Sequence, residues 1–478
     1  MMRSRFLRLL APSVVTPFLA ILIVCGIALG PASAVAGWKA GIATAKATPE
    51  TPMWMAGYGG RTAPAEGTRQ DLFVKVLAIE DDHGHRAVIY STDLLGIPQT
   101  IYNNVCAELE SRFLLTRADI MLNSSHTHSG PVLRGALHDI YPIAENPGQS
   151  EYIEEYSQKL EATLVRIAGE ALDNLAPASL KAGNGTTDFA VNRRENVESE
   201  VPKVRERGEQ LNGPVDHAVP VLAIYDTEDQ LTAVVFGYAC HNTVMGDNLW
   251  HGDYAGYAQA AFEEKHPGVA ALFYMGCGGD QNPIPRREEA LLTTYGNKLA
   301  TAVDEVLADS DALTTLPAKL ETSHHFAQLE LADTPSREEL EEIANNEKRA
   351  SYQRRWAQRL LDEMNAGDAF ITSYPLPLQA WELGDKQLWL TIGGEVTVDY
   401  ALVLKKMFGN DIWVAGYCND VPAYIPSLRV LDEDKHRLGY EGHSSMMVYG
   451  MPAMRWADSI ENEIIDGMSE LVKQVQGE

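Results

Sequence analysis

Short apolar runs typical of buried strands alternate along this chain with longer segments of helical periodicity, and this alternation constrains the fold most. Because several of the strand-like runs come in close pairs, the pattern predicts a mixed α/β fold in which β-sheets are flanked by outer helices. We expect one large domain over residues 38–478. The strand-like runs are residues 72–79, 86–90, 120–123, 219–225, 233–238, 270–275, 387–392 and 412–417, and the helical segments are 99–115, 151–174, 254–265, 289–308 and 398–407.

Two further segments have a distinct composition. Residues 337–364 are rich in Arg and Glu, with apolar residues at helical spacing, which predicts a surface insert of one or two amphipathic helices. Residues 184–210 are polar and poor in apolar side chains. We therefore expect a long exposed loop there, of the kind that often lines a site.

The first 34 residues have the pattern of a secretory signal peptide. Three arginines precede an apolar run over residues 14–29, and Ala32-Ser33-Ala34 is a small-residue cleavage site. This predicts export to the periplasm or the medium. The alternative is an uncleaved N-terminal segment that anchors the protein in a membrane, because the apolar run approaches spanning length.

The charge balance argues against a nucleic-acid partner. The chain has 39 basic and 66 acidic residues and a formal charge of −27, whereas phosphate contacts need clustered Lys and Arg. A small-molecule or lipid substrate is the expected partner, and the oligomeric state is not predicted. Beyond residue 34 no CxxC pair occurs, so a cysteine zinc site is not indicated, while disulfides and buried thiols both stay open. The cysteines concerned are Cys106, Cys240, Cys277 and Cys418.

A pair of histidines follows the predicted strand at residues 120–123. His126 and His128 stand in the segment Ser-His-Thr-His-Ser-Gly-Pro. If the extended conformation continues, both side chains project to the same face, because residues i and i+2 of a strand share a face. Two adjacent imidazoles are the start of a metal site or of an acid–base pair. The alternative is a pair of surface loop histidines.

Other polar residues also follow predicted strands. His241 ends one such run, and the carboxylate of Asp253 nearby is a candidate to orient it. Gly278-Gly279-Asp280 forms a glycine-rich turn whose backbone could approach a ligand closely. Glu395 lies behind two glycines, where it is either a ligand or a helix cap. The chain has no GxSxG, HExxH or GxGxxG motif, which disfavours those enzyme classes.

Taken in order, these motifs resemble the neutral (alkaline, non-lysosomal) ceramidase family. The similarity rests on the His-Thr-His-Ser-Gly-Pro stretch, the strand-end histidine, the Gly-Gly-Asp turn, the Gly-Gly-Glu junction and the ending Asn419, Tyr424, Tyr440-Glu441-Gly442. Met55-Ala56-Gly57-Tyr58 agrees as well. The resemblance covers roughly residues 38–455. It implies a neutral-ceramidase-like catalytic domain and a zinc-dependent enzyme, one ion per chain, that splits ceramide into sphingosine and a fatty acid.

The resemblance also implies roles for individual residues. The zinc ligands would be His126, His241, Glu395 and Tyr424, and His128 would stabilise the oxyanion. Arg193 and Tyr440 would be further active-site residues. Zinc lowers the pKa of a bound water from 15.7 toward ~7, so that a zinc hydroxide could attack the amide carbonyl. Two imidazoles, a carboxylate and a phenol oxygen suit zinc.

The chain departs from the family pattern in several places. Asn282 stands where the family has a serine, and Arg194 also replaces a serine. The interval between Tyr424 and Tyr440 is longer than in the family, and we expect the family's C-terminal β-sandwich to be missing. These departures keep two alternatives open: the same fold and metal acting on another substrate, such as a carbohydrate or another amide, or a non-catalytic binding protein. A lipid substrate would also imply transient contact with a membrane surface.

Overall fold

The computed structural model of the chain describes residues 37–437 and 439–477. Within this range the chain forms one compact unit. The predicted signal peptide at residues 1–34 lies outside the described residues, so its cleavage stays a prediction.

The larger of two main sheets is mixed and contains nine strands. Its two edges are parallel pairs, and the strands between them are antiparallel. The strands in spatial order are β11 (Ala270–Met275), β9 (Leu231–Tyr238), β8 (Ala218–Tyr225), β6 (Ala176–Thr186), β1 (Trp38–Lys46), β3 (Phe73–Glu80), β4 (Arg86–Thr92) and β5 (Ile120–Ser124), with β13 (Thr314–Leu316) paired to β6.

The smaller sheet has five strands and packs face to face on the larger one. Large side chains from both sheets fill the space between them. The smaller sheet contributes Trp381, Trp389 and Trp413, and the larger contributes Leu77 and Ile89. The strands in order are β18 (Trp413–Ala415), β16 (Gln387–Ile392), β15 (Ser373–Leu383), β14 (Leu320–Ala332) and β20 (Arg455–Trp456).

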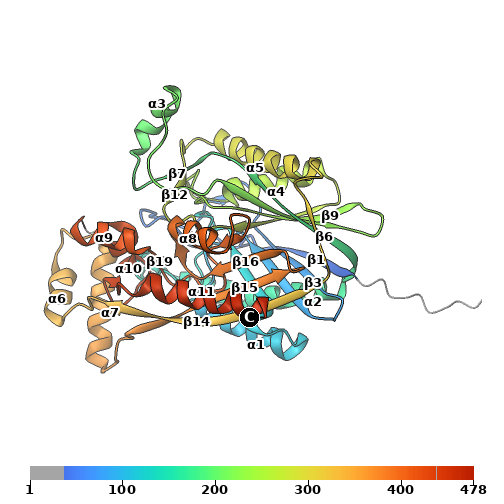
Figure 1. Cartoon of the computed structure of the whole chain (residues 1–478). Coiled ribbons are helices and arrows are strands. Elements are labelled where there is room, and N and C mark those ends of the chain that lie inside the picture. The colour runs from blue at the N-terminus through green and yellow to red at the C-terminus, as the bar shows by residue number, and fades with distance from the viewer. Residues whose placement is uncertain (1–36, 438, 478) are drawn as a thin grey trace, which may run out of the picture. The chain divides into compact units, whose positions relative to one another are not determined.

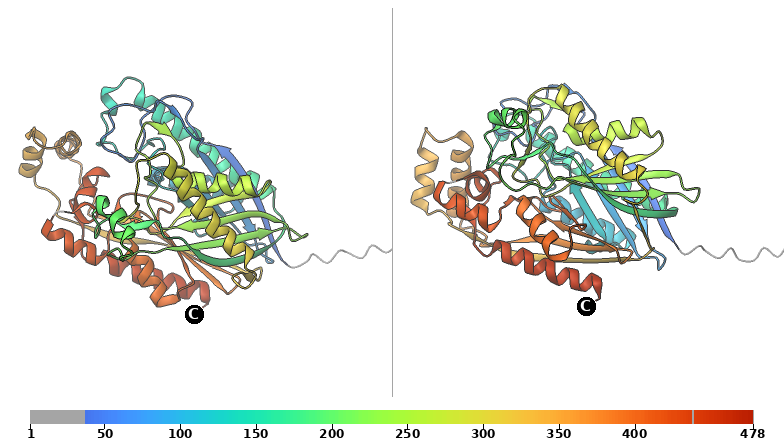
Figure 2. Two further views of the ribbon diagram at one scale, coloured as in Figure 1. Left: turned by 90° about the horizontal axis from the view of Figure 1, so that it is seen from above. Right: turned by 45° about the horizontal axis from the view of Figure 1, so that its top comes forward.

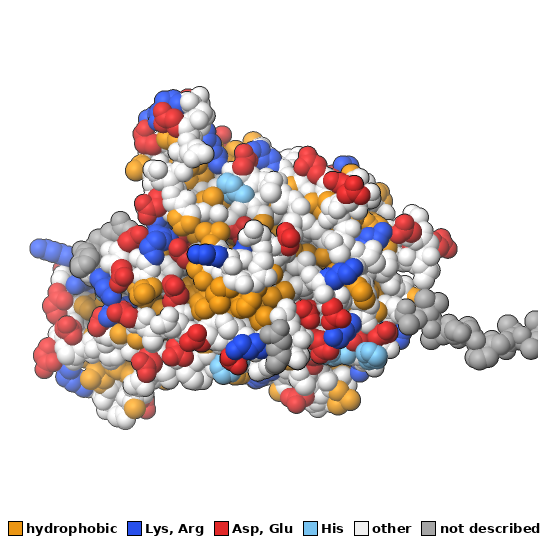
Figure 3. All heavy atoms as spheres, in the orientation of Figure 1, with side chains coloured by type: hydrophobic (Ala, Val, Ile, Leu, Met, Phe, Trp, Pro, Cys, Tyr) orange, Lys and Arg blue, Asp and Glu red, His pale blue; other side chains and the backbone are white. Residues whose placement is uncertain are grey.

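Helices cover the outer faces of both sheets, as Figures 1 and 2 show. On the larger sheet lie α1 (Gln99–Phe113), α2 (Gln149–Asp173), α4 (Asp253–Lys265) and α5 (Ala290–Ala308). On the smaller sheet lie α8 (Val398–Phe408) and α11 (Ile460–Gln476). The predicted class, a mixed α/β fold with outer helices, is therefore confirmed. Apolar side chains gather over α8 on the surface (Figure 3), where Leu402 is 37% and Met407 is 46% exposed.

The helical prediction for residues 337–364 is confirmed, because α6 (Arg337–Asn345) and α7 (Ser351–Ala366) lie there and share an apolar cluster around Trp356. The prediction of an uninterrupted loop over residues 184–210 is wrong. This segment contains β7 (Ala190–Asn192), a 3-10 turn η3 (Glu198–Glu200) and α3 (Val201–Glu206). Its few apolar residues suffice to anchor it, since Val191 and Val201 are buried against Ile284.

The remaining elements of the described chain are short, and some of them pair into two-stranded ladders outside the two main sheets. They are β2 (Gly67–Thr68), β10 (Leu249–Trp250), β12 (Gln281–Pro283), β17 (Glu395–Val396), β19 (Tyr424–Ile425), α9 (Leu428–Arg437), α10 (Ser445–Val448), the 3-10 turns η1 (Arg117–Asp119) and η2 (Ile143–Glu145), and the π-helical turn η4 (Tyr440–Ser444).

Two properties bear on the earlier expectations. The four cysteines beyond residue 34 are buried free thiols and form no disulfide with one another. They are Cys106, Cys240, Cys277 and Cys418. In the part of the chain that the structure describes, no helix combines the length and apolar character needed to cross a bilayer.

Candidate active site and metal centre

The two histidines that follow β5 lie side by side, although not for the reason expected. The strand ends at Ser124, and His126 has a φ of 60°, so the extended backbone does not continue through the pair. Their Nε2 atoms are nevertheless 3.1 Å apart. The loop is held by a bridge between Thr127 and Asn242, which places the pair beside His241.

His241 and His126 present the same nitrogen to a common point. The Nδ1 of His126 lies 2.6 Å from the carbonyl of Leu95, and the Nδ1 of His241 lies 2.7 Å from that of Gly278. Because a carbonyl can only accept, both Nδ1 atoms carry the proton and both Nε2 atoms keep a free lone pair. Burial lowers the pKa of His241 to about 4, with a further contribution from Arg193, so its imidazole is neutral at pH 7.

The expectation that Asp253 orients His241 is wrong. The carboxylate of Asp253 instead accepts the backbone N–H groups of Val244 and Met245, at 3.1 and 3.2 Å. It is the first residue of α4, where a carboxylate also interacts favourably with the helix N-terminus. The carbonyl of Gly278, in the glycine-rich turn, takes the orienting role.

A two-stranded parallel ladder brings Glu395 and Tyr424 together. These residues are direct partners in the pairing of β17 with β19. The Oε2 atom of Glu395 lies 3.0 Å from the Nε2 of His126 and 3.2 Å from that of His241. The phenol oxygen of Tyr424 lies 3.1 Å from the Nε2 of His241. The four side chains predicted as ligands therefore converge from four distant segments.

The spacing of these donors suits a tetrahedral ion. Ligand atoms about 2.0–2.1 Å from a tetrahedral zinc are roughly 3.3 Å from one another. The distances from the Glu395 Oε2 to His126 and His241, and from Tyr424 to His241, are 3.0, 3.2 and 3.1 Å. All four side chains are at most 2% exposed. His126, His128 and His241 could also hold a metal ion together, since their ring nitrogens lie within 4.8 Å of one another.

His128 differs from the other two histidines in its surroundings. Its Nδ1 is buried and has no hydrogen-bond partner among the described residues. Burial, and then the neighbouring histidines, hold the pKa of His128 well below its usual range. Its ring packs on Tyr58 at 4.7 Å between centroids. Its Nε2 lies against the bare Nε2 of His126, so in this structure the neutral ring carries its proton on Nε2.

Two tyrosines complete the surroundings of Glu395. Tyr449 donates to its Oε1, and the phenol oxygen of Tyr417 lies 3.4 Å from its Oε2. Burial alone would raise the pKa of Glu395, but His126 and His241 hold it well below its usual range. Tyr449 was missed by the sequence analysis. The only signal for it is an aromatic residue followed by a glycine, which is common in ordinary loops.

Arg193 links several of the predicted residues. Its guanidinium donates to the phenol oxygen of Tyr424 at 3.0 Å and to Glu441 at 2.9 Å, and lies 3.4 Å from the Oδ1 of Asn282. Burial raises the pKa of Tyr424 well above its usual value, and the positive charge on Arg193 opposes this only in part. Tyr440 is 42% exposed, and its ring is 5.3 Å from that of Tyr424, which places it at the mouth of the site.

The glycine-rich turn does not act as we expected. A Cβ at Gly279 would lie 2.8 Å from the backbone carbonyl oxygens of Glu395 and Val396. The glycine therefore allows close approach of β17 rather than of a ligand. Asp280 accepts from the N–H of Val398 at the start of α8, so the turn holds β17 and α8 in place.

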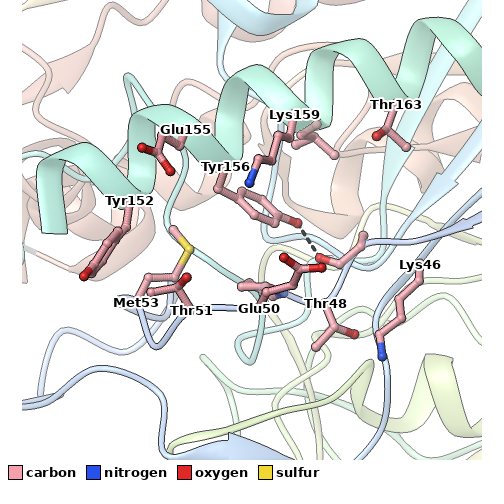
Figure 4. Close-up of a pocket in the computed structure, with 13 residues that line it drawn as sticks. Lys46, Thr48, Glu50, Thr51, Met53, Tyr152, Glu155, Tyr156, Lys159 and Thr163 are labelled. Atoms are coloured by element: carbon pink, nitrogen blue, oxygen red, sulfur yellow. Dashed lines mark hydrogen bonds between the residues drawn. The ribbon is translucent and has the colours of Figure 1, made fainter. Parts of the chain in front are cut away.

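Two hollows differ in their relation to the site. One of about 420 Å³ is lined by Arg193, Asn282 and Tyr440, at the mouth of the candidate site. Another, of about 340 Å³, lies between residues 46–53 and α2 (Figure 4). In the second, Tyr156 donates to the carbonyl of Ala47 across the hollow. None of the predicted site residues lines it.

Known proteins are similar to this chain in sequence and in fold. The sequence matches the family described as "Neutral/alkaline non-lysosomal ceramidase, N-terminal" over residues 38–303. It is 25% identical to the neutral ceramidase of Drosophila melanogaster over 256 residues, which is 52% of this chain and 34% of that protein. It is 26% identical to neutral ceramidase B of Dictyostelium discoideum over 246 residues, 48% of this chain and 33% of that one.

The crystal structure of the neutral ceramidase from Pseudomonas aeruginosa has the same fold. It superposes with a TM-score of 0.66 at 17% identity, over 92% of this chain and 74% of that chain. In sequence, however, this chain matches only about a third of the length of the curated relatives. The family match covers more than half of the chain and includes His126, His128, Arg193, His241 and Asn282. The chain therefore belongs to the neutral/alkaline non-lysosomal ceramidase family.

Proposed function

We propose that this protein is a zinc-dependent hydrolase that cleaves the amide bond of ceramide or of a closely related N-acyl compound. The observation that carries the proposal is the pair of histidines with protonated Nδ1 atoms, whose Nε2 lone pairs converge with a carboxylate and a phenol oxygen. This donor set, buried in a protein of the ceramidase family, suits one zinc ion per chain. A lipid substrate, and with it contact with a membrane surface, follows from the same proposal.

A bound zinc ion would supply Lewis acidity and a nucleophile available at neutral pH. The chain's own residues have separate roles. His128 faces the substrate carbonyl and donates a hydrogen bond to the developing oxyanion through its Nε2, the nitrogen that faces the histidine cluster, a contribution typically worth about 3–4 kcal/mol. Arg193 holds Tyr424 in its ligand orientation. Tyr440, at the mouth, contacts the substrate outside the reacting centre.

Export belongs to the same proposal. The residues that carry the signal-peptide pattern precede the described part of the chain, and the relatives are named neutral ceramidases. We infer a periplasmic or secreted enzyme, with retention by an uncleaved segment as the alternative. N-terminal sequencing of the protein recovered from the producing cells distinguishes a chain that begins near Ala34 from one that begins at Met1.

Metal analysis combined with activity tests the proposal. Purified full-length protein should contain one zinc per chain and release fatty acid from a labelled ceramide. His126→Ala and His241→Ala should each lose the zinc and at least 100-fold in kcat/KM, because a tetrahedral site with three donors binds weakly. His83→Ala, whose side chain is 80% exposed, is the matched control. Full activity of the zinc-free His126→Ala protein would refute the proposal.

A second candidate keeps the metal chemistry and changes the substrate. Asn282, which is 4% exposed beside Arg193, stands where the family resemblance leads us to expect a serine. A substrate panel that includes ceramide, N-acyl ethanolamines and glycosides separates the two. Turnover of another amide at more than ten times the rate for ceramide would favour this second candidate.

A further inference from the structure

An open hollow of about 650 Å³ lies beside His128. Residues 58–62, residues 245–248 and Arg287 line it. Tyr58 connects this hollow to the catalytic cluster, because its ring packs on the imidazole of His128 at 4.7 Å. Arg61 makes a second connection by donating to the backbone carbonyl of His128 at 2.7 Å. The side chain of Tyr58 would thus separate a molecule bound in the hollow from His128.

Arg61 is a buried cation without an ionic partner. Its side chain donates to the backbone carbonyls of Ala56, His128 and Asp247, at 2.7, 2.7 and 3.0 Å. The residue is only 7% exposed, and its Nε has no hydrogen-bond partner in the described chain. Among the described residues, no carboxylate lies within 4.0 Å of its guanidinium. A buried charge of this kind costs several kcal/mol unless it is paired.

Arg287 is a second cation of the same hollow. Its Nη1 donates to the phenol oxygen of Tyr58 at 3.0 Å. The guanidinium carbons of Arg61 and Arg287 lie 5.0 and 4.8 Å from the centre of the Tyr58 ring. Arg287 also has a φ of 79°, a left-handed conformation that is strained for a non-glycine residue and is concentrated at ligand sites.

Neighbouring arginines show what is unusual about this pair. Arg286, the adjacent residue, makes a bidentate pair with Glu198 at 2.8 Å for each bond, and Arg193 pairs with Glu441. In a chain with 66 acidic and 39 basic residues, most arginines of this region find a carboxylate. Within the part of the chain that the structure describes, Arg287 has none within 4.0 Å.

The one carboxylate that lines the hollow is already engaged. Asp247 forms an ion pair with Arg69 at 2.7 Å, and Arg69, like His251, helps to hold the pKa of Asp247 well below its usual value although burial opposes this. The hydrogen bond between Asp247 and Arg61 uses the backbone carbonyl of Asp247 and not its carboxylate. The hollow therefore presents two guanidinium groups that, in the described chain, have no carboxylate within 4.0 Å, and guanidinium groups are the side chains best suited to bind carboxylate or phosphate.

We propose that this hollow binds an oxyanion of the substrate, so that among N-acyl compounds the enzyme prefers those that carry a carboxylate or phosphate group over neutral ones such as ceramide. This specificity rests on the proposed amide hydrolysis at the histidine cluster. Arg287 provides the exposed contact, Arg61 supplies a fixed positive charge below it, and Tyr58 sets the distance between the anion and His128. A neutral N-acyl compound gains nothing from either guanidinium.

Three substrates with the same acyl chain test the specificity. They are N-dodecanoylglycine, N-dodecanoylethanolamine phosphate and neutral N-dodecanoylethanolamine. We expect kcat/KM for at least one anionic compound to exceed that for the neutral compound by tenfold or more, and the preferred anion identifies the group. In Arg287→Gln this preference should fall at least tenfold. Arg286→Gln, which removes an adjacent arginine paired with Glu198, should change the preference less than twofold.

A binding measurement separates this proposal from the proposed function. Dodecanesulfonylglycine has no amide carbonyl to cleave, and its affinity for the full-length protein is measured by titration calorimetry. If Arg287→Gln binds dodecanesulfonylglycine at least tenfold more weakly and no amide is turned over, the oxyanion site is supported and amide hydrolysis is refuted. Turnover of amides with equal preference in the wild type and Arg287→Gln would overturn the oxyanion site and keep the hydrolase.

Discussion

The two carboxylate oxygens of Glu395 have different surroundings. Oε2 faces the histidines, whereas Oε1 accepts a hydrogen bond from Tyr449. A ligand carboxylate held by such a partner can bind an ion through one oxygen only, and partners of this kind typically contribute 10–100-fold to metal affinity. We therefore expect Tyr449 to act as a positioning residue for Glu395.

We expect Tyr449→Phe to weaken zinc binding by about 10–100-fold, because the freed carboxylate can rotate away from its ligand orientation. Competition with a chelator of known affinity measures the change. Tyr156→Phe removes a comparable hydrogen bond, to the carbonyl of Ala47, far from the site and should leave zinc affinity unaltered. Equal zinc affinity in Tyr449→Phe and the wild type would show that Tyr449 has only a structural role.

Gly57 determines where the His128 ring can lie. Its φ is +101°, and a Cβ at this position would lie 2.5 Å from the Cγ of His128. Gly57→Ala should displace the ring and lower kcat by about 100-fold, the loss typical of a misplacement of about 1 Å. Steady-state kinetics at saturating ceramide measure it. Gly67→Ala meets only an ordinary contact at 3.4 Å and is the control. A normal kcat in Gly57→Ala would show that His128 takes no part in the reaction.

At the scale of elements, short ladders and one helix fix the site. The β17–β19 ladder aligns two predicted ligands, and β12 pairs with β7 to bring Asn282 next to Arg193. Helix α7 restrains the segment that carries Tyr449. Arg359 on this helix donates to the carbonyl of Gly450 at 2.7 Å and to Asp139 at 2.9 Å. The helical insert is therefore connected to the candidate site.

Replacing Arg359 should loosen this connection. We expect Arg359→Met to lower the free energy of unfolding by about 1–3 kcal/mol, because Asp139 is 6% exposed and loses its ionic partner. Urea unfolding followed by circular dichroism gives the value. Arg166→Met breaks an exposed pair with Glu170 and should cost about 0.5 kcal/mol or less. Equal costs for the two variants would contradict a bracing role for α7.

At the scale of the whole molecule, buried carboxyls make stability depend on pH. Burial raises the pKa of Asp93 to about 6, against 3.8 in the unfolded chain. Between these values the native state binds the extra proton, so the contribution of Asp93 to stability is highest below pH 4 and falls as pH rises to 6. The backbone N–H of Phe73 donates to this carboxyl at 2.9 Å, a bond that an amide oxygen can also accept.

Asp93→Asn should remove this pH dependence. Relative to the variant, the wild type should lose roughly 2 kcal/mol of stability between pH 4 and pH 6, because the two pKa values differ by about two units at 1.36 kcal/mol each and part of the titration lies outside this range. Urea unfolding of both proteins at several pH values gives the difference. Glu154→Gln changes an exposed carboxyl and controls for the charge removed. A difference between wild type and Asp93→Asn that does not vary with pH would mean that Asp93 is ionised throughout.

Local patterns predicted most of the main elements. The runs at residues 120–123 and 387–392 became β5 and β16 nearly to the residue, and the helical segment at 254–265 became α4. Their periodicity reflects burial on a sheet or helix face, which neighbours in the chain encode. The long exposed loop predicted for residues 184–210 was wrong. Two valines of this segment, Val191 and Val201, anchor it by contact with Ile284, which is distant in the sequence.

The sequence by itself determined the mixed α/β class and the order of the motifs that mark the family. Only the tertiary structure decided which imidazole nitrogens of His126 and His241 carry no proton. That depends on the carbonyl of Leu95, 31 residues from His126, and on that of Gly278, 37 residues from His241. It also decided that Tyr449 donates to Glu395 and that, in the described structure, no carboxylate lies within 4.0 Å of the guanidinium of Arg61 or Arg287. Periodicity is a property of adjacent residues, whereas hydrogen bonding and charge compensation depend on segments that only folding brings together.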